Sequence, residues 1–144
     1  MNGALRGPSN AVAGMPVMQR IPTLVGVGGH FAGEIFPLEY GKTVTVGRSR
    51  AANFSLRRTQ KYRAQTEQER ESDESAKTVS AKHFEITMYN LGSIEVKSLS
   101  SNGMLLDGKP VKAAMLDDIA KKSHEIRFGA DEVLKLEMRV HEDL

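Results

Sequence analysis

The sequence contains no cysteine and no tryptophan, and aromatic residues fill only 6% of its 144 positions. Without cysteine, disulfides, thiolate catalysis and Cys-based metal sites are excluded. No apolar run approaches the roughly 20 residues that a membrane helix needs, and the N-terminus shows no secretory signal. We therefore expect a cytoplasmic protein that does not associate with membranes, with the nucleus as the alternative location in a eukaryote.

Neither sign of charge dominates the composition. Lysine and arginine number 20, aspartate and glutamate number 18, and the net charge is +2. Domains that bind nucleic acid usually carry a marked basic excess, so no nucleic-acid partner is expected. The short basic cluster at 57–63 leaves weak nucleic-acid binding as an alternative, although no aromatic stacking platform accompanies it.

Short apolar or β-branched runs recur from Pro22 onward, and several alternate apolar with polar residues, as in TVTV at 43–46 and LKLEM at 134–138. Period-two alternation in short segments predicts an all-β fold, an antiparallel sandwich or barrel, and the length suits a single domain. We place this domain at residues 22–140, after a flexible arm at 1–21 and before a short tail at 141–144.

A polar segment at residues 57–78 interrupts the β pattern. Its charges are sorted, with basic residues first and acidic residues after them: Arg57, Arg58, Lys61, Arg63, then Glu67, Glu69, Glu71, Asp73, Glu74. Such a segment has too little apolar surface to offset its ordering entropy, so we predict a mobile loop. A short helix over 61–71 is the alternative, but the like charges of Glu67 and Glu71 at i,i+4 weaken it.

Catalytic and cofactor motifs are incomplete. GKT at 41–43 ends like a phosphate-binding P-loop, yet Phe36 occupies the position of the first glycine. The four histidines are not at metal-ligand spacing, and the adjacent carboxylates at 117–118 suit a solvated surface. We expect no enzyme activity, no cofactor and no metal site.

Two turn signals, NG at 102–103 and DG at 107–108, stand five residues apart. Glycine accepts positive φ, and Asn or Asp side chains bond their own backbone, so both dipeptides are typical of tight turns. They leave room for one very short strand between them. We expect Leu105 or Leu106 in that strand to point into the core.

Three separated segments place polar side chains near strand ends. Arg48 follows one predicted strand, Ser80 and Lys82 precede another, and Asn102 lies in a turn. Because a β-sandwich gathers alternate loops at one end, we expect these side chains to face a common ligand. A guanidinium fork, a hydroxyl, an ammonium group and an amide together suit a tetrahedral anion carried by a peptide.

Three short motifs stand in a fixed order on this all-β pattern: GR at 47–48, SAKH at 80–83 and SNG at 101–103. With them, the chain resembles the forkhead-associated (FHA) domain family over residues 22–140. The resemblance implies an 11-stranded antiparallel β-sandwich whose loops at one end bind a phosphothreonine peptide without catalysis. The implied partner is a phosphothreonine-containing protein, and the chain itself is expected to be a monomer.

The resemblance also implies a role for each matching position. Arg48 would hold the phosphate, Ser80 would donate its hydroxyl to a phosphate oxygen, and Asn102 would bond the peptide main chain. Ser101 and Lys82 would lie beside them as further contacts. The positions that are structural in the family correspond here to Gly47, His83 and Gly103.

Two departures from the family pattern leave an alternative function open. Ala81 stands where relatives commonly have a polar residue, and the insertion at 57–78 is expected near the site. The alternative is an FHA-fold scaffold that binds a partner independently of phosphate. A further hypothesis is that a kinase modifies hydroxyls of the insertion, which then dock into a neighbouring molecule; these are Thr59, Thr66, Ser72, Ser75 and Thr78.

Overall fold

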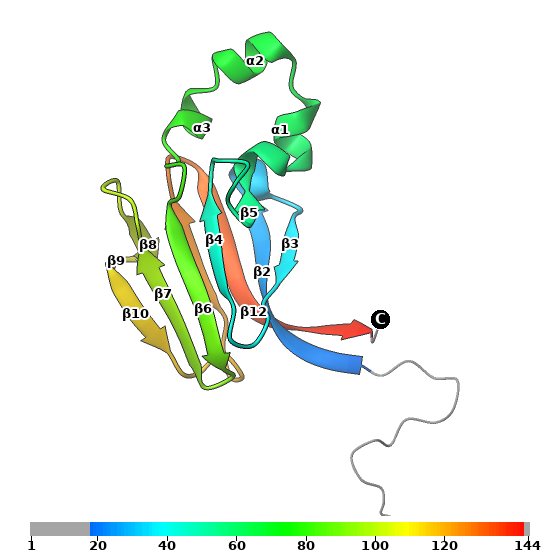
Figure 1. The fold of residues 1–144 in the computed structure, drawn as a ribbon, viewed down its shortest axis with the longest axis vertical. Coiled ribbons are helices and arrows are strands. Elements are labelled where there is room, and N and C mark those ends of the chain that lie inside the picture. Colours follow the sequence, from blue (N-terminus) through cyan, green and yellow to red (C-terminus); the bar gives the residue numbers. More distant parts are fainter. Residues whose placement is uncertain (1–17, 143–144) are drawn as a thin grey trace, which may run out of the picture.

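The alternation at 43–46 becomes strand β4 of a sandwich made of two sheets (Figure 1). The computed structural model describes residues 18–142. The six-stranded sheet has the order β3 (Ile35–Pro37), β2 (Met18–Gly28), β12 (Glu132–Glu142), β11 (His124–Phe128), β8 (Met104–Leu106) and β9 (Lys109–Pro110). The five-stranded sheet has the order β10 (Ala113–Leu116), β7 (Ser93–Ser98), β6 (Phe84–Asn90), β4 (Thr43–Gly47) and β5 (Phe54–Ser55). The predicted 11-stranded β-sandwich is confirmed, with β4 and β5 as a parallel pair in otherwise antiparallel sheets.

The register of β4, β6 and β7 shows how alternating residues fill the core. Val46 lies opposite Phe84 and Val44 opposite Ile86, while Ile86 also faces Val96 of β7. All five side chains are buried, and the residues between them are more exposed. Period-two alternation thus gives the sheet one apolar face, which packs against the other sheet.

Phenylalanine rings join the two sheets near one end of the sandwich. Phe84, the first residue of β6, meets Phe128, the last residue of β11, with ring centroids 5.2 Å apart and an interplanar angle of 74°. Phe31, which ends the 3-10 helix η1 (Gly29–Phe31), contacts Phe54 at 4.8 Å. Such edge-on ring pairs stabilise a core by more than the burial of their apolar surface alone. The loops at this end are therefore supported by well-packed strand ends.

The DG turn at 107–108 joins β8 to β9. Asp107 and Gly108 have φ values of 51° and 82°, as a tight hairpin with two left-handed central residues requires. In β8, Leu106 is 7% exposed and Leu105 is 36% exposed. The short strand predicted between the two turns is therefore confirmed, and Leu106 is its core leucine.

The outer ends of β2 and β12 pair with each other as a ribbon that projects from the sandwich (Figure 1). Residues 18–21 and 141–142 belong to this ribbon, so the arm predicted at 1–21 and the tail predicted at 141–144 are wrong at their inner ends. Main-chain pairing between the two strands orders these residues, although their sequence shows little periodic pattern. The remainder of both segments lies outside the described residues.

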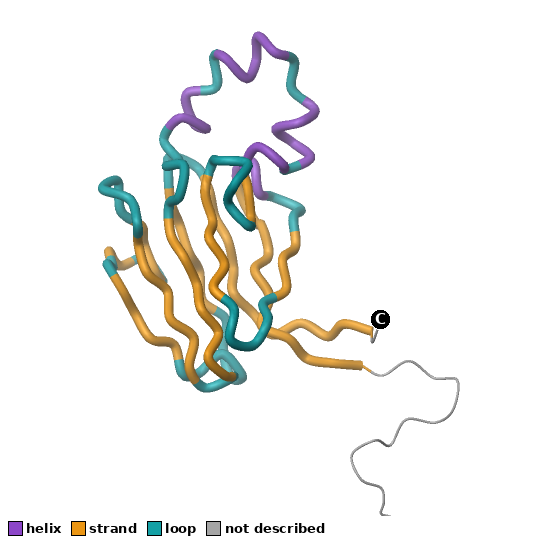
Figure 2. The backbone as a smooth tube through the Cα atoms, in the orientation of Figure 1, coloured by secondary structure: helices purple, strands orange, loops and turns teal. Residues whose placement is uncertain are grey.

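The insertion forms short helices instead of the predicted mobile loop, and they arch over one end of the sandwich (Figure 2). They are the 3-10 helix η2 (Leu56–Arg58), α1 (Gln60–Ala64), α2 (Glu67–Glu71) and α3 (Glu74–Lys77).

Side-chain caps explain this order. Thr59, Thr66 and Asp73 each accept a backbone N–H in the first turn of α1, α2 and α3, and Thr66 forms a reciprocal capping box with Glu69. Extended backbone at 65–66 separates α1 from α2, so the alternative of one helix over 61–71 is also wrong. Thr59 is buried, which places its hydroxyl out of reach of a kinase while α1 is folded.

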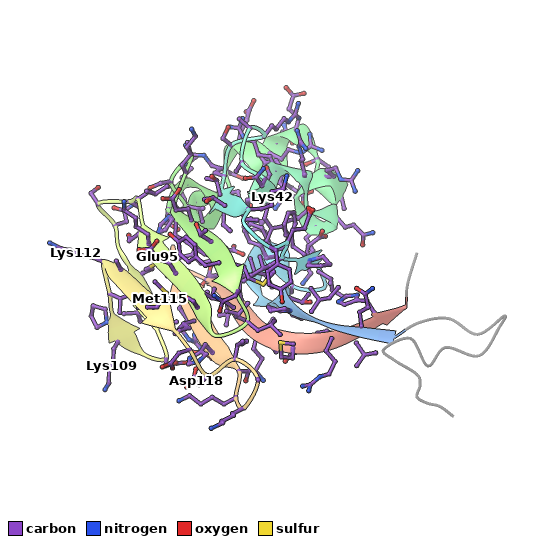
Figure 3. The ribbon with its side chains drawn as sticks, turned by 60° about the horizontal axis from the view of Figure 1, so that its bottom comes forward. Lys42, Glu95, Lys109, Lys112, Met115 and Asp118 are labelled. Carbon is purple, nitrogen blue, oxygen red and sulfur yellow. The ribbon has the colours of Figure 1, made fainter. Side chains whose placement is uncertain are left out.

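The outer face of the five-stranded sheet is open to solvent. Met115 of β10 lies opposite Glu95 of β7, and Figure 3 labels both on this face. Met115 is among the exposed large apolar residues, and Glu95 accepts a hydrogen bond from the hydroxyl of Tyr89. None of the helices in residues 18–142 has the length and apolar character of a membrane span.

Candidate functional site

Three strand ends bring the predicted recognition residues to one end of the sandwich. β4 ends, β6 begins and β7 ends on the same side of the five-stranded sheet, because β6 is antiparallel to both neighbours. The loops after β4 and before β6 lie beneath the helical insertion, and the loop after β7 stands to the side of it (Figure 2). Arg48, Ser80 and Asn102 all come from these loops, and Arg48 and Asn102 both bond to the segment at 77–80, which ends in Ser80.

Arg48 is held by carbonyl groups of that segment. Its backbone N–H donates to the carbonyl oxygen of Ser80 at 2.9 Å. Its side-chain Nη1 donates to the carbonyl oxygens of Val79 at 2.8 Å and Lys77 at 3.3 Å. The side chain is half-buried, and its Nε and Nη2 have no hydrogen-bond partner within residues 18–142. The guanidinium is therefore oriented through one nitrogen while other donors are left for a ligand.

Ser80 connects to the third loop through Ser100. The two hydroxyl oxygens lie 2.6 Å apart, and the backbone N–H of Asn102 donates to Ser100 Oγ at 3.0 Å. The Asn102 side-chain Nδ2 donates to the carbonyl oxygen of Thr78 at 3.4 Å. The Oδ1 atom of this exposed carboxamide has no partner among the described residues, so the carboxamide keeps an acceptor for a ligand.

His83 links the same two loops from inside. Its Nδ1 accepts the backbone N–H of Ser80 at 3.0 Å, and its Nε2 lies 2.7 Å from the carbonyl oxygen of Gly103. An N–H donor on one side and a carbonyl acceptor on the other require the neutral imidazole with its proton on Nε2. Burial lowers the pKa of His83 below its ordinary value, although the Gly103 carbonyl opposes this. The loop conformation is therefore tied to a neutral histidine.

Gly47 permits the close approach of the loops. A Cβ at this position would lie 2.2 Å from the carbonyl oxygen of Ala81. In contrast, Gly103 has open space around it, but its φ of +75° favours glycine. The two glycines thus serve the loop end for different reasons, one for space and the other for backbone conformation.

Two predicted contacts, Ser101 and Lys82, lie on the exposed rim of the site. Neither side chain has a hydrogen bond or ion pair with the described residues. They lie next to the recognition loops, and their groups remain available to solvent or to a ligand.

Two hollows adjoin the recognition loops. A hollow of about 420 Å³ beside Asn102 includes apolar groups of Met104, Phe128 and Ala130 in its lining. The other, of about 460 Å³, lies between Arg48 and the helical insertion, which supplies charges of both signs. The lining charges of this second hollow are Arg48, Arg57, Arg70, Lys77, Glu67, Glu71 and Asp73.

No cluster of three or more His, Asp or Glu side chains within residues 18–142 is arranged to hold a metal ion. His30 lies between two carboxylates, but each ring nitrogen faces a different one. The ligand atoms therefore do not converge on one point.

Sequence reasoning missed two contributors to the site. Ser100 joins the Ser80 hydroxyl to the Asn102 backbone, and the carbonyl of Thr78 accepts from the Asn102 side chain. The run SLSSN at 98–102 carried a signal for Ser100, because serine hydroxyls commonly bond the backbone two residues ahead. No sequence pattern predicts that the backbone carbonyl of Thr78 accepts this hydrogen bond.

Comparisons with known proteins agree with this architecture. The family model described as "FHA domain" matches residues 44–129, which is more than half of the chain. No curated protein sequence matches the chain.

Solved FHA structures have a similar fold. The FHA domain of CT664 protein from Chlamydia trachomatis is 22% identical with a TM-score of 0.58, and the match covers 83% of this chain and 98% of that one. A structure from work on phosphothreonine-dependent FHA domain interactions is 24% identical with a TM-score of 0.55, covering 80% and 94%. The FhaA FHA domain, solved with the intracellular domain of Rv3910, is 23% identical with a TM-score of 0.53, covering 79% and 98%.

The chain therefore belongs to the FHA domain family, as its motifs predicted. FHA domains generally bind phosphothreonine peptides and are typically non-catalytic binding modules.

Proposed function

We propose that this FHA domain binds phosphothreonine peptides of a partner protein through Arg48, Ser80 and Asn102, without catalysis. The observation that carries the proposal is the arrangement around Arg48. Nη1 is held by two carbonyls, Nε and Nη2 have no partner within residues 18–142, and the loops of Ser80 and Asn102 lie alongside.

The donor set suits a phosphorylated strand. A phosphothreonine carries nearly two negative charges at neutral pH, and a guanidinium can fork two of its oxygens. Ser80 supplies a neutral hydroxyl donor. The carboxamide of Asn102 offers both a donor and an acceptor, which matches the C=O and N–H of a peptide main chain. Lys82 and Ser101, on the exposed rim, supply further polar contacts.

Similar structures support this choice of partner. One comes from work on phosphothreonine-dependent FHA interactions, and another is a complex with the intracellular domain of a second protein. The first favours a phosphothreonine-containing protein as the partner. The second favours binding inside the cell, in the cytoplasm.

A peptide array tests the proposal directly. Each member carries a central phosphothreonine with varied flanks and is paired with its unphosphorylated twin. Wild type should bind only phosphorylated members, and Arg48→Ala should lose about 2–5 kcal/mol of binding free energy, because a desolvated charge contact is removed. Arg139→Ala is the matched control, since Arg139 pairs with Glu137 in the projecting ribbon at a distance from the site. Equal binding of both twins, or full affinity in Arg48→Ala, contradicts the proposal.

A phosphate-independent scaffold is the second candidate. A hollow of about 330 Å³ beside the ribbon is lined by apolar groups of Pro22, Leu38 and Met88, and Tyr40 at its rim is 62% exposed. Retention of the partner by Arg48→Ala, together with an unresponsive phosphopeptide array, is the result that favours it.

A further inference from the structure

The recognition side chains of Arg48 and Asn102 share one support. Arg48 Nη1 donates to the carbonyls of Lys77 and Val79, and Asn102 Nδ2 donates to the carbonyl of Thr78. These three consecutive carbonyls begin with that of Lys77, the last residue of α3, and continue through Thr78, its C-cap, to Val79. The position of α3 therefore sets where two groups from different loops point.

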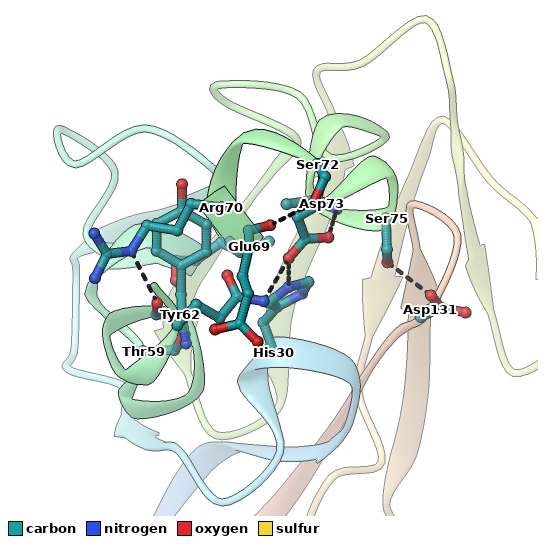
Figure 4. Close-up of polar contacts among 12 residues, drawn as sticks. His30, Thr59, Tyr62, Glu69, Arg70, Ser72, Asp73, Ser75 and Asp131 are labelled. Carbon is teal, nitrogen blue, oxygen red and sulfur yellow. Dashed lines mark hydrogen bonds and ion pairs between the residues drawn. The ribbon is translucent and has the colours of Figure 1, made fainter. Parts of the chain in front are cut away.

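Hydrogen bonds tie this support to the turn between β11 and β12. Thr78 Oγ1 accepts the backbone N–H of Ala130 at 2.7 Å and donates to the carbonyl oxygen of Ser75 at 2.6 Å. Ser75 Oγ in turn donates to Asp131 Oδ2 at 2.7 Å (Figure 4). The end of the insertion is thus bonded to the body of the domain on one side.

His30, a partly exposed histidine, supplies the second attachment (Figure 4). His30 Nδ1 lies 2.7 Å from Glu132 Oε2, and His30 Nε2 lies 2.7 Å from Asp73 Oδ2. The exposed fraction of the side chain is 11% for His30, 0% for Glu132 and 9% for Asp73. Glu132 also accepts the backbone N–H groups of His30 and Phe31, while Asp73 caps α3 by accepting the N–H of Ala76. The histidine therefore links β12 to the first turn of α3.

Two carboxylates require a doubly protonated ring. Carboxylates only accept hydrogen bonds, so both nitrogens of His30 must donate. Burial opposes the charged form, but the hydrogen bonds to Glu132 and Asp73 outweigh it, and the pKa of His30 lies above its ordinary value. The attachment is therefore strongest with a charged His30.

We propose that His30, Asp73 and Glu132 are positioning residues for phosphopeptide recognition, because their link holds α3 and thereby aims the two recognition side chains. This inference rests on the proposed function. The physical gain is pre-organisation: a polar insertion that is already ordered adds less entropy cost to peptide binding.

The domain contains a matched control for this link. His124, at the start of β11, also lies between two carboxylates, with Asp107 on Nδ1 and Asp118 on Nε2, each at 2.6 Å. It lies at the opposite end of β11 from the turn that holds the insertion. His30→Gln and His124→Gln therefore remove the same kind of contact, but only the first touches the insertion.

Two measurements distinguish the variants. The first is NMR of the peptide-free protein, in which His30→Gln should shift the side-chain amide signal of Asn102 and the Nε–H signal of Arg48, whereas His124→Gln should not. The second is affinity for the tightest phosphothreonine peptide of the array. His30→Gln should lower it roughly 2- to 30-fold, the range of couplings carried by residues outside a binding site, and His124→Gln should leave it unchanged.

The pH dependence of affinity is a further readout that a purely structural role does not move. Above about pH 7 the phosphate keeps its charge, while His30 loses its proton as the pH rises through its raised pKa, and one carboxylate then loses its donor. Wild type and His124→Gln should therefore weaken over this range, and His30→Gln should not. The other titratable or charged groups near His30 are Tyr62, with its ring centroid 6.1 Å away, and Lys61, Glu69 and Asp131, which line the same hollow.

A folded His30→Gln with unchanged Asn102 and Arg48 signals and full affinity overturns the inference. If His30→Gln does not fold, Asp73→Asn replaces it, because asparagine keeps the cap of α3 while it removes the charge. If wild type ignores the phosphate but the signals move in His30→Gln alone, the proposed function fails and the positioning link is supported. The two ideas are therefore separable.

Discussion

The hydroxyl oxygens of Ser80 and Ser100 lie 2.6 Å apart, although the two residues belong to different loops. Ser100 Oγ also accepts the backbone N–H of Asn102. Ser100 can then donate its own proton to Ser80, which leaves the Ser80 proton free for a phosphate oxygen. Ser100 thus connects two proposed recognition residues.

This connection predicts an effect of Ser100→Ala. We expect the variant to lose about 0.5–1.5 kcal/mol of phosphopeptide binding free energy, less than Ser80→Ala, because it removes a supporting hydrogen bond and no direct contact. Isothermal titration calorimetry measures the difference. Ser93→Ala, at the opposite end of β7, is the control and should bind as wild type does. An affinity of Ser100→Ala equal to that of the control contradicts the assignment.

The buried bridge of His83 predicts a stability change with a defined pH dependence. His83→Ala leaves the N–H of Ser80 and the carbonyl of Gly103 without their partner, at a cost of about 1–3 kcal/mol of unfolding free energy. Because burial lowers the pKa of His83, its contribution is present above about pH 6.5 and is lost as the pH falls through the folded-state value. Urea unfolding of both proteins at several pH values should show their difference narrowing on acidification. A difference that widens in acid rules out the neutral bridge.

His124 predicts the opposite sign. Burial opposes its charged form, but the hydrogen bonds to Asp107 and Asp118 outweigh this and raise its pKa. Its contribution to stability is therefore full below about pH 6.5, as long as both carboxylates stay ionised, and is lost as the pH rises through the folded-state value. The difference in unfolding free energy between wild type and His124→Gln should be largest near pH 6 and should shrink toward alkaline pH. A difference that does not depend on pH would show that the ring is not protonated in the fold.

The two glycines of the site predict different costs. Gly47→Ala places a Cβ against the backbone of Ala81, and no side-chain movement relieves this clash. We expect the free energy of unfolding to fall by about 3 kcal/mol or more, and phosphopeptide binding to be lost as well. Gly103→Ala meets no atom within 4 Å and should cost only about 1–2 kcal/mol for its left-handed φ. Thermal unfolding ranks the two variants. The reverse order would show that backbone strain at Gly103 outweighs the close approach at Gly47.

Local patterns predicted much of the fold, because strands and turns depend on near neighbours. Alternation at 43–46 marked β4, and the DG dipeptide at 107–108 marked the β8–β9 turn. The insertion was misjudged even though its signals are local: Thr66 with Glu69 is a capping box, and Asp73 is a helix cap. Its low apolar content suggested a mobile loop. However, the helix caps and the hydrogen bonds to the rest of the domain offset the conformational entropy that is lost when the insertion is ordered.

By itself, the sequence determined the β-sandwich, its family and the motifs that carry Arg48, Ser80 and Asn102, because these depend on local alternation and on short ordered motifs. The tertiary structure alone decided how the site is held. His30 contacts Asp73 and Glu132, which lie 43 and 102 positions away in the chain. No local sequence pattern marks either contact. Such contacts arise only when folding brings distant backbone together, and they decide where the recognition side chains point.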